Sequence, residues 1–174
     1  MEENGVPVWG IRTGRPRGAT KETHRVLEQE MDSLFKRGYI ALGWPQVGNL
    51  DELPNDREAF RERVRGGHQG EASSATVGAD AGMLFRFVHE MQTGDLVVYH
   101  SRVDGRIHIG RVAGPYIFAP NMNEDYPALR RVEWLVARPK TDFSDEARRA
   151  LKARSSLAQV RTGVDEFRAA ARTP

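Results

Sequence analysis

Basic side chains gather near the start of the chain, where the sequence becomes rich in glycine and proline. The segment "VWGIRTGRPRGATK" begins with strand-forming residues and continues with Arg12, Arg15, Arg17 and Lys21, without any acidic residue. Arginine makes planar, bidentate contacts with phosphates and base edges that lysine cannot reproduce. The segment therefore predicts contacts with nucleic acid, and Arg15, Arg17 and Lys21 are the candidate phosphate-binding residues.

Aromatic side chains form a second candidate group. Five of them lie within or just after expected strands: Trp9, Trp44, Tyr99, Tyr116 and Trp134. Large aromatic residues in strands belong to the core more often than to a binding site. Trp44 is the best exception, because it ends a strand before Pro45 and several small residues, where its ring could border a cavity. An aromatic face beside arginines could hold an extruded base while the cations hold the phosphates.

The patterns of common catalytic and metal sites are missing from the sequence. There is no cysteine, and the five histidines lack a metal-binding spacing. The chain has no P-loop, no GxGxxG after a strand and no GxSxG elbow. His89 beside Glu90 is the nearest candidate acid–base pair, but its expected helix is rich in core residues, which favours an ordinary polar pair. The sequence predicts a non-catalytic protein without a metal or another cofactor.

The composition fits a single soluble domain with a modest charge. The chain has 174 residues, of which 39% are hydrophobic and 29% charged, and its formal net charge is +2. Arginine supplies all but four of the 26 cations, although a GC-rich genome would produce the same bias. No apolar run approaches the roughly 18 residues of a membrane span, and the N-terminus lacks a signal peptide's apolar segment. We therefore expect a cytoplasmic protein with no membrane partner.

Hydrophobic periodicity predicts the element order β-α-β-α-α-β-β-β-α-α, which is a mixed α+β fold with helices around a bent sheet. The expected strands lie at 6–13, 39–44, 96–103, 106–118 and 130–137, and the expected helices at 23–37, 56–66, 83–91 and, as two short helices, after 144. The small-residue stretch 68–82 is expected to be a connection. Asp104–Gly105 predicts a two-residue hairpin turn, which would pair Ser101 with His108 and Tyr99 with Gly110.

At this hairpin the sequence resembles a known family. "GDLVVYHSRVDGRIHIGRVAGPY" is similar to the core of EVE domains, which belong to the PUA-like superfamily together with YTH and ASCH domains. "VWGIRTG" resembles their opening strand, and "IALGWPQVGNL" followed by "FVHEMQTGDLVV" resembles a bacterial subgroup found with Mrr- and McrBC-type restriction components. The likeness covers about Val6 to Ala137. It implies a bent mixed sheet or pseudo-barrel of five to six strands over residues 1–140, with a C-terminal helical extension over 141–174 that packs on it or on a partner.

The resemblance also implies a pocket that reads a modified nucleobase, as YTH relatives do for methylated adenine. The matching base-pocket positions are Arg12 and Thr13 on the first strand, Gly43 and Trp44 on the second, and Tyr99, His100 and Ser101 before the turn. Trp9 is a further candidate for stacking. This chain departs from the family where the first strand ends in "IRTGR" instead of Lys-Ser-Glu-Pro, and where the second lacks Trp-x-Gly-Val-Arg-Asn, so the base it reads can differ.

We therefore expect a non-catalytic reader of a modified, flipped base in DNA, linked to bacterial restriction or defence. In this hypothesis the base stacks between Trp44 and Tyr99 or Trp9, and DNA is favoured over RNA as the partner. The resemblance also suggests a restriction nuclease or an NTPase subunit as a partner. Two alternatives stay open: an RNA-binding module, and a domain that senses a small molecule or nucleotide or docks a protein.

Overall fold

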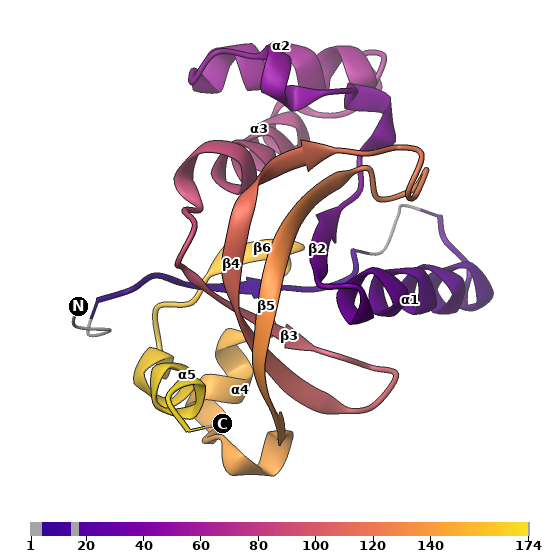
Figure 1. The fold of residues 1–174 in the computed structure, drawn as a ribbon. Coiled ribbons are helices and arrows are strands. Elements are labelled where there is room, and N and C mark those ends of the chain that lie inside the picture. The colour runs from indigo at the N-terminus through magenta and orange to yellow at the C-terminus, as the bar shows by residue number, and fades with distance from the viewer. Residues whose placement is uncertain (1–4, 15–17, 174) are drawn as a thin grey trace.

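Six strands form one mixed, curled sheet with helices around it (Figure 1). The structure is a computed structural model that describes residues 5–14 and 18–173. In chain order the helices and strands are β1 (Val8–Ile11), α1 (Lys21–Lys36), β2 (Tyr39–Leu42), α2 (Arg57–Gly67), α3 (Ser74–Phe85), β3 (Leu96–His100), β4 (Arg106–Phe118), β5 (Ala128–Pro139), α4 (Asp145–Ala150), β6 (Leu157–Gln159) and α5 (Val164–Ala171). The expected α+β class and the bent mixed sheet of up to six strands are confirmed.

The strand order is β2-β5-β4-β3-β1-β6. β1 runs parallel to β3, and the other neighbouring pairs are antiparallel. β4 and β5 are the two long strands, and their register shifts after Ile109 and again after Val112. Such bulges increase the local twist, and both strands curve through the centre of the molecule in Figure 1.

Alternating residues of β1 and β3 face two separate cores, as the two-residue period of a strand requires. Trp9 and Tyr99 belong to the larger core, which also contains the apolar faces of α1, α2 and α3. Val8 and Val98 belong to the smaller core, which contains Phe167 of α5 and residues of α4. Helices therefore cover both sides of this part of the sheet, and Figure 1 shows α2 and α3 at one end of the molecule and α4 and α5 at the other.

The helices α1 to α4 begin at residues whose side chains accept backbone hydrogen bonds. Thr20 caps α1, Asp56 caps α2 and Ser144 caps α4, and all three are residue types that favour this position. The expected connection at 68–82 is wrong, because α3 begins inside it. Ser73 caps α3 by accepting a hydrogen bond from the Thr76 N–H at 3.1 Å, so the small residues that follow are helical, and the chain continues as a π-helix over Arg86–Glu90.

The predicted hairpin register is also wrong. Tyr99 pairs with His108, and Gly110 pairs with Val97. Ser101 is the reason, because its hydroxyl accepts hydrogen bonds from the N–H groups of Val103 and Asp104 and so closes a longer loop. The shift is two residues, which keeps every side chain on its expected face.

Gly110 leaves space for β5 and not for a ligand above Tyr99. A Cβ at this position would lie 2.5 Å from Val132 Cγ1 and 2.8 Å from Trp134 Cε3. The Trp134 indole fills this space and donates a hydrogen bond from Nε1 to the carbonyl oxygen of Phe35 at 2.9 Å. A glycine is therefore needed here for the close approach of β5 to β4.

The C-terminal segment is part of the sheet. The expected extension over 141–174 contains α4 and α5 but also a strand, because β6 pairs with β1. β6 is only three residues long, and "LAQ" alone carries no alternating pattern that would reveal it. Arg168 of α5 donates hydrogen bonds to the carbonyl oxygen of Val6, which ties this end to the approach to β1.

Arg130 is a buried cation that supports the π-helix. It is 3% exposed and donates hydrogen bonds to the carbonyl oxygens of Phe87, Met91 and Gly114 at distances between 2.6 and 3.1 Å. Burial lowers the pKa of this guanidinium. Its donors satisfy carbonyl groups at the irregular helix end that would otherwise lack partners.

Within the described residues, no helix combines the length and the hydrophobicity that a membrane span requires.

Candidate nucleic-acid interface

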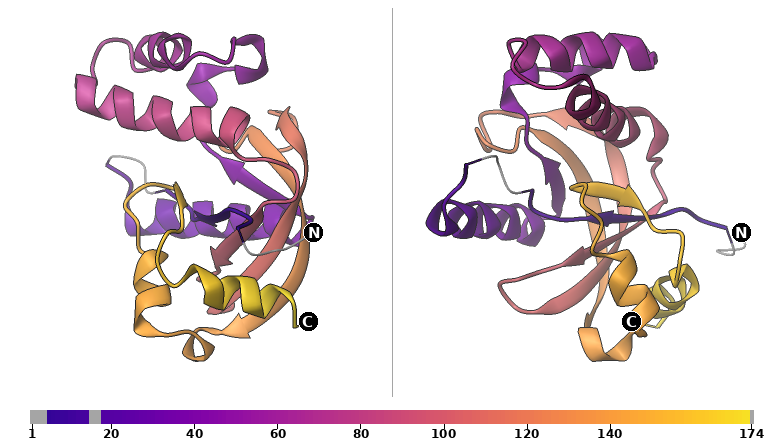
Figure 2. Two further views of the ribbon diagram at one scale, coloured as in Figure 1. Left: turned by 90° about the vertical axis from the view of Figure 1, so that its left-hand side faces the viewer. Right: turned by 180° about the vertical axis from the view of Figure 1, so that it is seen from behind.

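A cleft of about 990 Å³ lies where β1 and β3 end. It is bordered by the first half of α1, the β3–β4 hairpin and α4, and Figure 2 shows these elements around the end of β1 when the molecule is seen from behind. Because β1 and β3 are parallel neighbours, their last residues reach the same edge of the sheet. The volume is at the upper end of the range that encloses a small ligand, so it is large enough for a nucleotide.

Cations dominate the lining of this cleft. The six cationic residues are Arg12, Arg102, Lys140, Arg148, Arg149 and Lys152. The acidic residues among the described lining are Glu28 and Asp145. Glu28 pairs with Arg102 at 3.3 Å, and Asp145 pairs with Arg148 within α4. Four of the cations thus lack an acidic partner in the part of the chain that the structure describes, and the cleft is suited to an anionic ligand.

Arg12 is a half-buried cation of the cleft. Its Nη2 donates a hydrogen bond to the carbonyl oxygen of Arg154 at 2.5 Å, while its Nε is buried and has no hydrogen-bond acceptor among the described residues. Burial lowers the pKa of the guanidinium, and repulsion from Arg102 lowers it further. Arg12 therefore carries a charge that is only partly solvated and that no described carboxylate balances.

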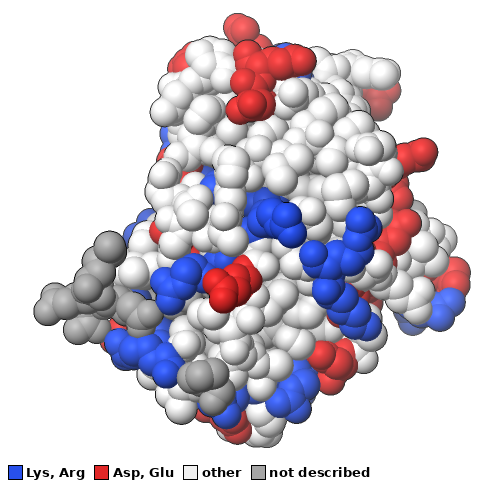
Figure 3. Space-filling model, viewed as in Figure 1, with Lys and Arg blue, Asp and Glu red and all other residues white. Residues whose placement is uncertain are grey.

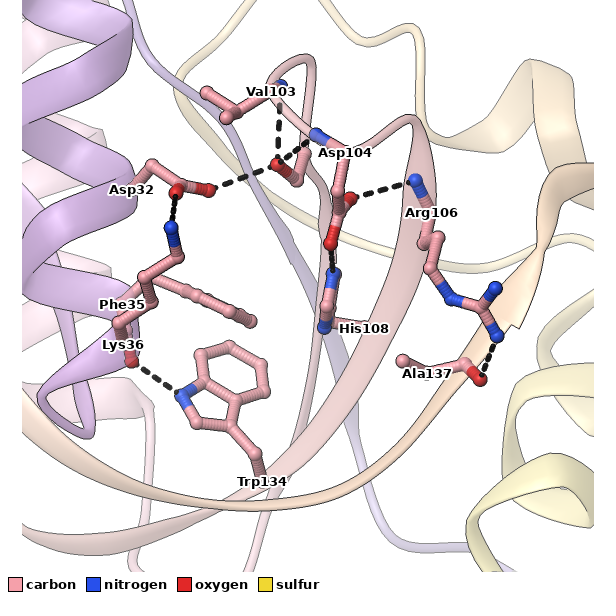
Figure 4. Close-up of polar contacts among 10 residues, drawn as sticks. Asp32, Phe35, Lys36, Val103, Asp104, Arg106, His108, Trp134 and Ala137 are labelled. Atoms are coloured by element: carbon pink, nitrogen blue, oxygen red, sulfur yellow. Dashed lines mark hydrogen bonds and ion pairs between the residues drawn. The ribbon is translucent and has the colours of Figure 1, made fainter.

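A network of polar contacts fixes the hairpin that carries Arg102 (Figure 4). The Ser101 hydroxyl donates to Asp32 of α1 at 2.9 Å, and the same carboxylate accepts from Lys36 at 3.0 Å. Within the loop, the carboxylate of Asp104 lies 2.7 Å from Nε2 of His108, which is on β4. Hydrogen bonding and the charge of the neighbouring imidazole lower the pKa of Asp104, against the opposing effect of burial. Ser101 thus holds the hairpin against α1 on one side, and on the other side the His108 ring packs edge-on against Phe35 of α1 with centroids 4.5 Å apart.

Three ring side chains line the cleft, and they differ in their exposure: His24 is half-buried, Tyr99 is buried and His100 is exposed. Tyr99 is 4% exposed and packs against Phe35 with ring centroids 5.0 Å apart. Burial raises the pKa of its phenol well above the usual value. The His100 side chain is exposed, and the partial desolvation of its ring lowers its pKa below the ordinary value, which favours the neutral imidazole. Among the rings of the described lining, His100 has the largest exposure to a ligand in the cleft.

The structure places four of the predicted base-pocket residues together in this cleft: Arg12, Thr13, Tyr99 and His100. It places two others in the interior. Trp9 is 2% exposed and donates its indole N–H to Asp95 at 2.8 Å, and Ser101 is fully buried and serves the hairpin loop. Both side chains are enclosed by the core, and neither is among the residues that line the cleft.

Trp44 and Gly43 are not among the residues that line the cleft. Trp44 is half-buried and has a left-handed backbone with φ of 60°, which is uncommon for a bulky residue. Its Nε1 donates to Asp80 of α3 at 3.2 Å, and His68 lies 3.0 Å from the same carboxylate oxygen. The structure therefore ties Trp44 to α2 and α3, and it does not bring Trp44 to Arg12 and Tyr99.

Of the three predicted phosphate-binding residues, the structure describes one, Lys21. Arg15 and Arg17 lie outside the described residues. Lys21 is exposed at the first position of α1 and is not part of the described lining.

Five cations of the cleft were missed by the sequence analysis: Arg102, Lys140, Arg148, Arg149 and Lys152. The density of cations in "RRALKAR" was the available pattern, but its position opposite β1 depends on the fold.

The face of the molecule seen in Figure 1 differs from the cleft in its charge distribution. On the face seen in Figure 1, Lys and Arg form separate groups with Asp and Glu between them (Figure 3). The lining of the cleft has a single dominant sign instead. Within the described residues, no group of three or more His, Asp or Glu side chains is arranged to hold a metal ion.

The fold and the site define an α+β protein with a basic cleft at the ends of two parallel strands. Residues 21–160 match the family described as "Domain of unknown function (DUF8426)". This match covers more than half of the chain, so the chain belongs to that family. The comparisons with curated proteins and with solved structures find no match. The matched residues include every side of the cleft except the end of β1.

Proposed function

We propose that this protein is a non-catalytic, PUA-like module of the EVE type that binds DNA and reads a modified base in the basic cleft. One observation carries the proposal: six cations from four parts of the chain surround the residues at the ends of β1 and β3. The curled mixed sheet is compatible with a PUA-like pseudo-barrel. The link to bacterial restriction or defence comes from the sequence resemblance.

The phosphate side of the cleft is supplied by α4 and the residues near it. Lys140, Arg149 and Lys152 are exposed, and none of them pairs with an acidic residue among those described. Phosphate contacts of this kind give affinity and position but no sequence information. They explain how the protein would hold a strand of any sequence.

The base side of the cleft is supplied by Arg12, Thr13 and His100. A guanidinium and a hydroxyl can donate hydrogen bonds to a base edge, and the neutral imidazole can contact its face. Because Tyr99 is buried against Phe35, its ring supports the floor of the cleft and does not stack on a ligand. This arrangement replaces the predicted cage of Trp44 and Tyr99 with a cleft that has one exposed ring.

The experiment is a binding panel measured by fluorescence anisotropy. Duplexes of one sequence carry methyladenine, methylcytosine, hydroxymethylcytosine or no modification, and each is titrated at two salt concentrations. We expect all duplexes to bind more weakly at the higher salt concentration, and one modified duplex to bind tightest. The His100→Ala variant should reduce the preference for that duplex, because a ring contact contributes about 1–3 kcal/mol.

Two outcomes would contradict the proposal. Tighter binding of a matched RNA than of every DNA duplex would favour the RNA-binding alternative, since contacts with the 2′-hydroxyl distinguish the two. Absence of binding to any nucleic acid at low salt would favour a small-molecule or protein partner.

A further inference from the structure

Glu28 is the acidic residue that joins two borders of the cleft. Its Oε1 lies 3.3 Å from Nε of Arg102 on the hairpin and 3.7 Å from Nδ1 of His24 on α1. The Glu28 side chain is 18% exposed, whereas that of Arg102 is 72% exposed. Among the described residues of the lining, the other acid is Asp145, and it pairs with Arg148 on its own helix. Glu28 is thus the carboxylate that holds a cation in place across the cleft.

Arg12 and Arg102 carry more positive charge than Glu28 balances. Arg12 donates to a carbonyl oxygen, and no described carboxylate forms an ion pair with it. Burial lowers the pKa of the Arg12 guanidinium, and the charge of Arg102, which lines the same cleft, lowers it further. An enclosed cation without a counter-ion is unfavourable, so an anion that enters between them is stabilised by both.

We propose that Arg12 and Arg102 form a phosphate subsite, and that Glu28 occupies the Arg102 side of it until a phosphate of the ligand takes its place. This inference rests on the proposed function and names the group that the strand presents at the end of β1. A phosphate offers oxygens in the geometry that a guanidinium binds, as a carboxylate does. Arg102 therefore exchanges one oxyanion for another.

The hairpin makes this exchange a local one. Ser101 and Asp32 hold the backbone next to Arg102, so the side chain can change partners while the loop stays in place. Glu28 keeps His24 as a neighbour after the exchange. A ligand without a phosphate, such as a free base or a nucleoside, leaves the Glu28–Arg102 pair intact. The cleft therefore selects a phosphate-bearing strand over the free base.

The test is a double-mutant cycle measured with one fluorescein-labelled DNA duplex. Glu28→Gln should bind the duplex about fivefold more tightly than the unmodified protein, because a partly exposed ion pair contributes up to about 1 kcal/mol. In the Arg102→Ala background the same substitution should raise the affinity for the duplex by less than about twofold, since the competing ion pair is already absent. Glu62→Gln removes an equal charge from the exposed face of α2 and should change affinity by less than about twofold.

Two results would overturn the subsite. One is an equal increase in affinity from Glu28→Gln and from Glu62→Gln, which would show a general effect of net charge. The other is a full gain from Glu28→Gln in the Arg102→Ala background.

Inorganic phosphate provides a readout that does not depend on DNA. At constant ionic strength, phosphate in place of chloride should raise the Tm of Glu28→Gln more than that of Glu28→Gln/Arg102→Ala. If the duplex fails to bind but phosphate has this effect, the proposed function fails and the subsite stands. If the duplex binds but the cycle shows no coupling and phosphate has no effect, the subsite fails and the proposed function stands.

Discussion

Removal of two cations from the α4 side of the cleft gives the sharpest test of its role. Arg149 lies in α4 and Lys152 just after it, and both are exposed. Arg149 donates to the carbonyl oxygen of Asp145 at 3.3 Å, and neither side chain forms an ion pair with a described residue. The double substitution Arg149→Ala/Lys152→Ala should therefore leave the fold intact and remove two phosphate contacts.

The size of the effect follows from counterion release. Four of the six lining cations lack an acidic partner among the described residues. Each phosphate contact on duplex DNA contributes about −0.9 to the slope of log K against log salt, so four to six contacts predict a slope between about −3.6 and −5.4. Loss of two contacts makes the slope less steep by about 1.8. Between 50 and 200 mM salt, the variant should lose about tenfold less affinity than the unmodified protein does.

The assay is fluorescence anisotropy of one labelled duplex at several salt concentrations. Arg61→Ala/Arg65→Ala is the matched control, because it removes two exposed arginines from α2, which does not border the cleft. Its slope should stay within about 0.5 of the unmodified value. Equal slopes for the two double variants would refute the assignment of phosphate contacts to α4 and would show that net charge alone governs binding.

Three further predictions concern stability. Ser101→Ala should lower the free energy of unfolding by about 2 kcal/mol or more, because the buried Asp32 and the loop N–H groups lose their partner. Arg130→Met should lower it by about 3 kcal/mol or more, since three carbonyl oxygens lose their donor. Burial, and secondarily Asp125, raise the pKa of Glu30. A raised pKa stabilises the fold below the ordinary pKa and loses that contribution as pH rises through the folded value. Glu30→Gln should therefore gain stability relative to the unmodified protein between pH 4.5 and 8.

Urea unfolding measures the free energy of unfolding of these three variants, and each variant has its own control. Ser74→Ala replaces an exposed serine at the start of α3 and should change stability by no more than about 0.5 kcal/mol. Arg131→Met, one residue further along β5, should cost about 1 kcal/mol at most, because that guanidinium is exposed over the Tyr39 ring. Glu62→Gln is the control for Glu30→Gln, and its stability relative to the unmodified protein should not increase as pH rises. A stability difference for Glu30→Gln that stays constant or declines as pH rises would contradict the assigned cause.

The sequence was sufficient for the element order except β6. Strong amphipathic periodicity and caps such as Thr20 and Ser144 marked α1 and α4, and β-branched runs marked β3 and β4. The hairpin register was missed because Asp104–Gly105 is a strong turn pattern, whereas the hydroxyl of Ser101 takes over the loop N–H groups once it is anchored to Asp32. That anchor comes from α1, so no local pattern contains it.

The candidate site was predictable only in part, for a similar reason. The ends of the first strand and of the YHS strand were expected to form the pocket, and Arg12, Thr13 and His100 do line the cleft. Trp44 was expected beside them because it follows β2, but β2 is at the other end of the strand order from β1. The cations of α4 were missed because the alignment of that helix with the cleft depends on β6 pairing with β1.

The position of the cleft follows from the one parallel pair in the sheet. In an antiparallel pair, the end of one strand lies beside the start of the next, so two strand ends cannot meet. β1 and β3 are parallel, with Ile11 opposite Tyr99, so Arg12, which follows β1, and His100, the last residue of β3, emerge at the same edge. β6 then pairs with the outer side of β1. The chain that leads into β6 passes through α4, and for this reason the C-terminal cations face the strand ends. The topology that joins the ends of these two distant segments thus also brings to them the cations on which the proposed phosphate contacts depend.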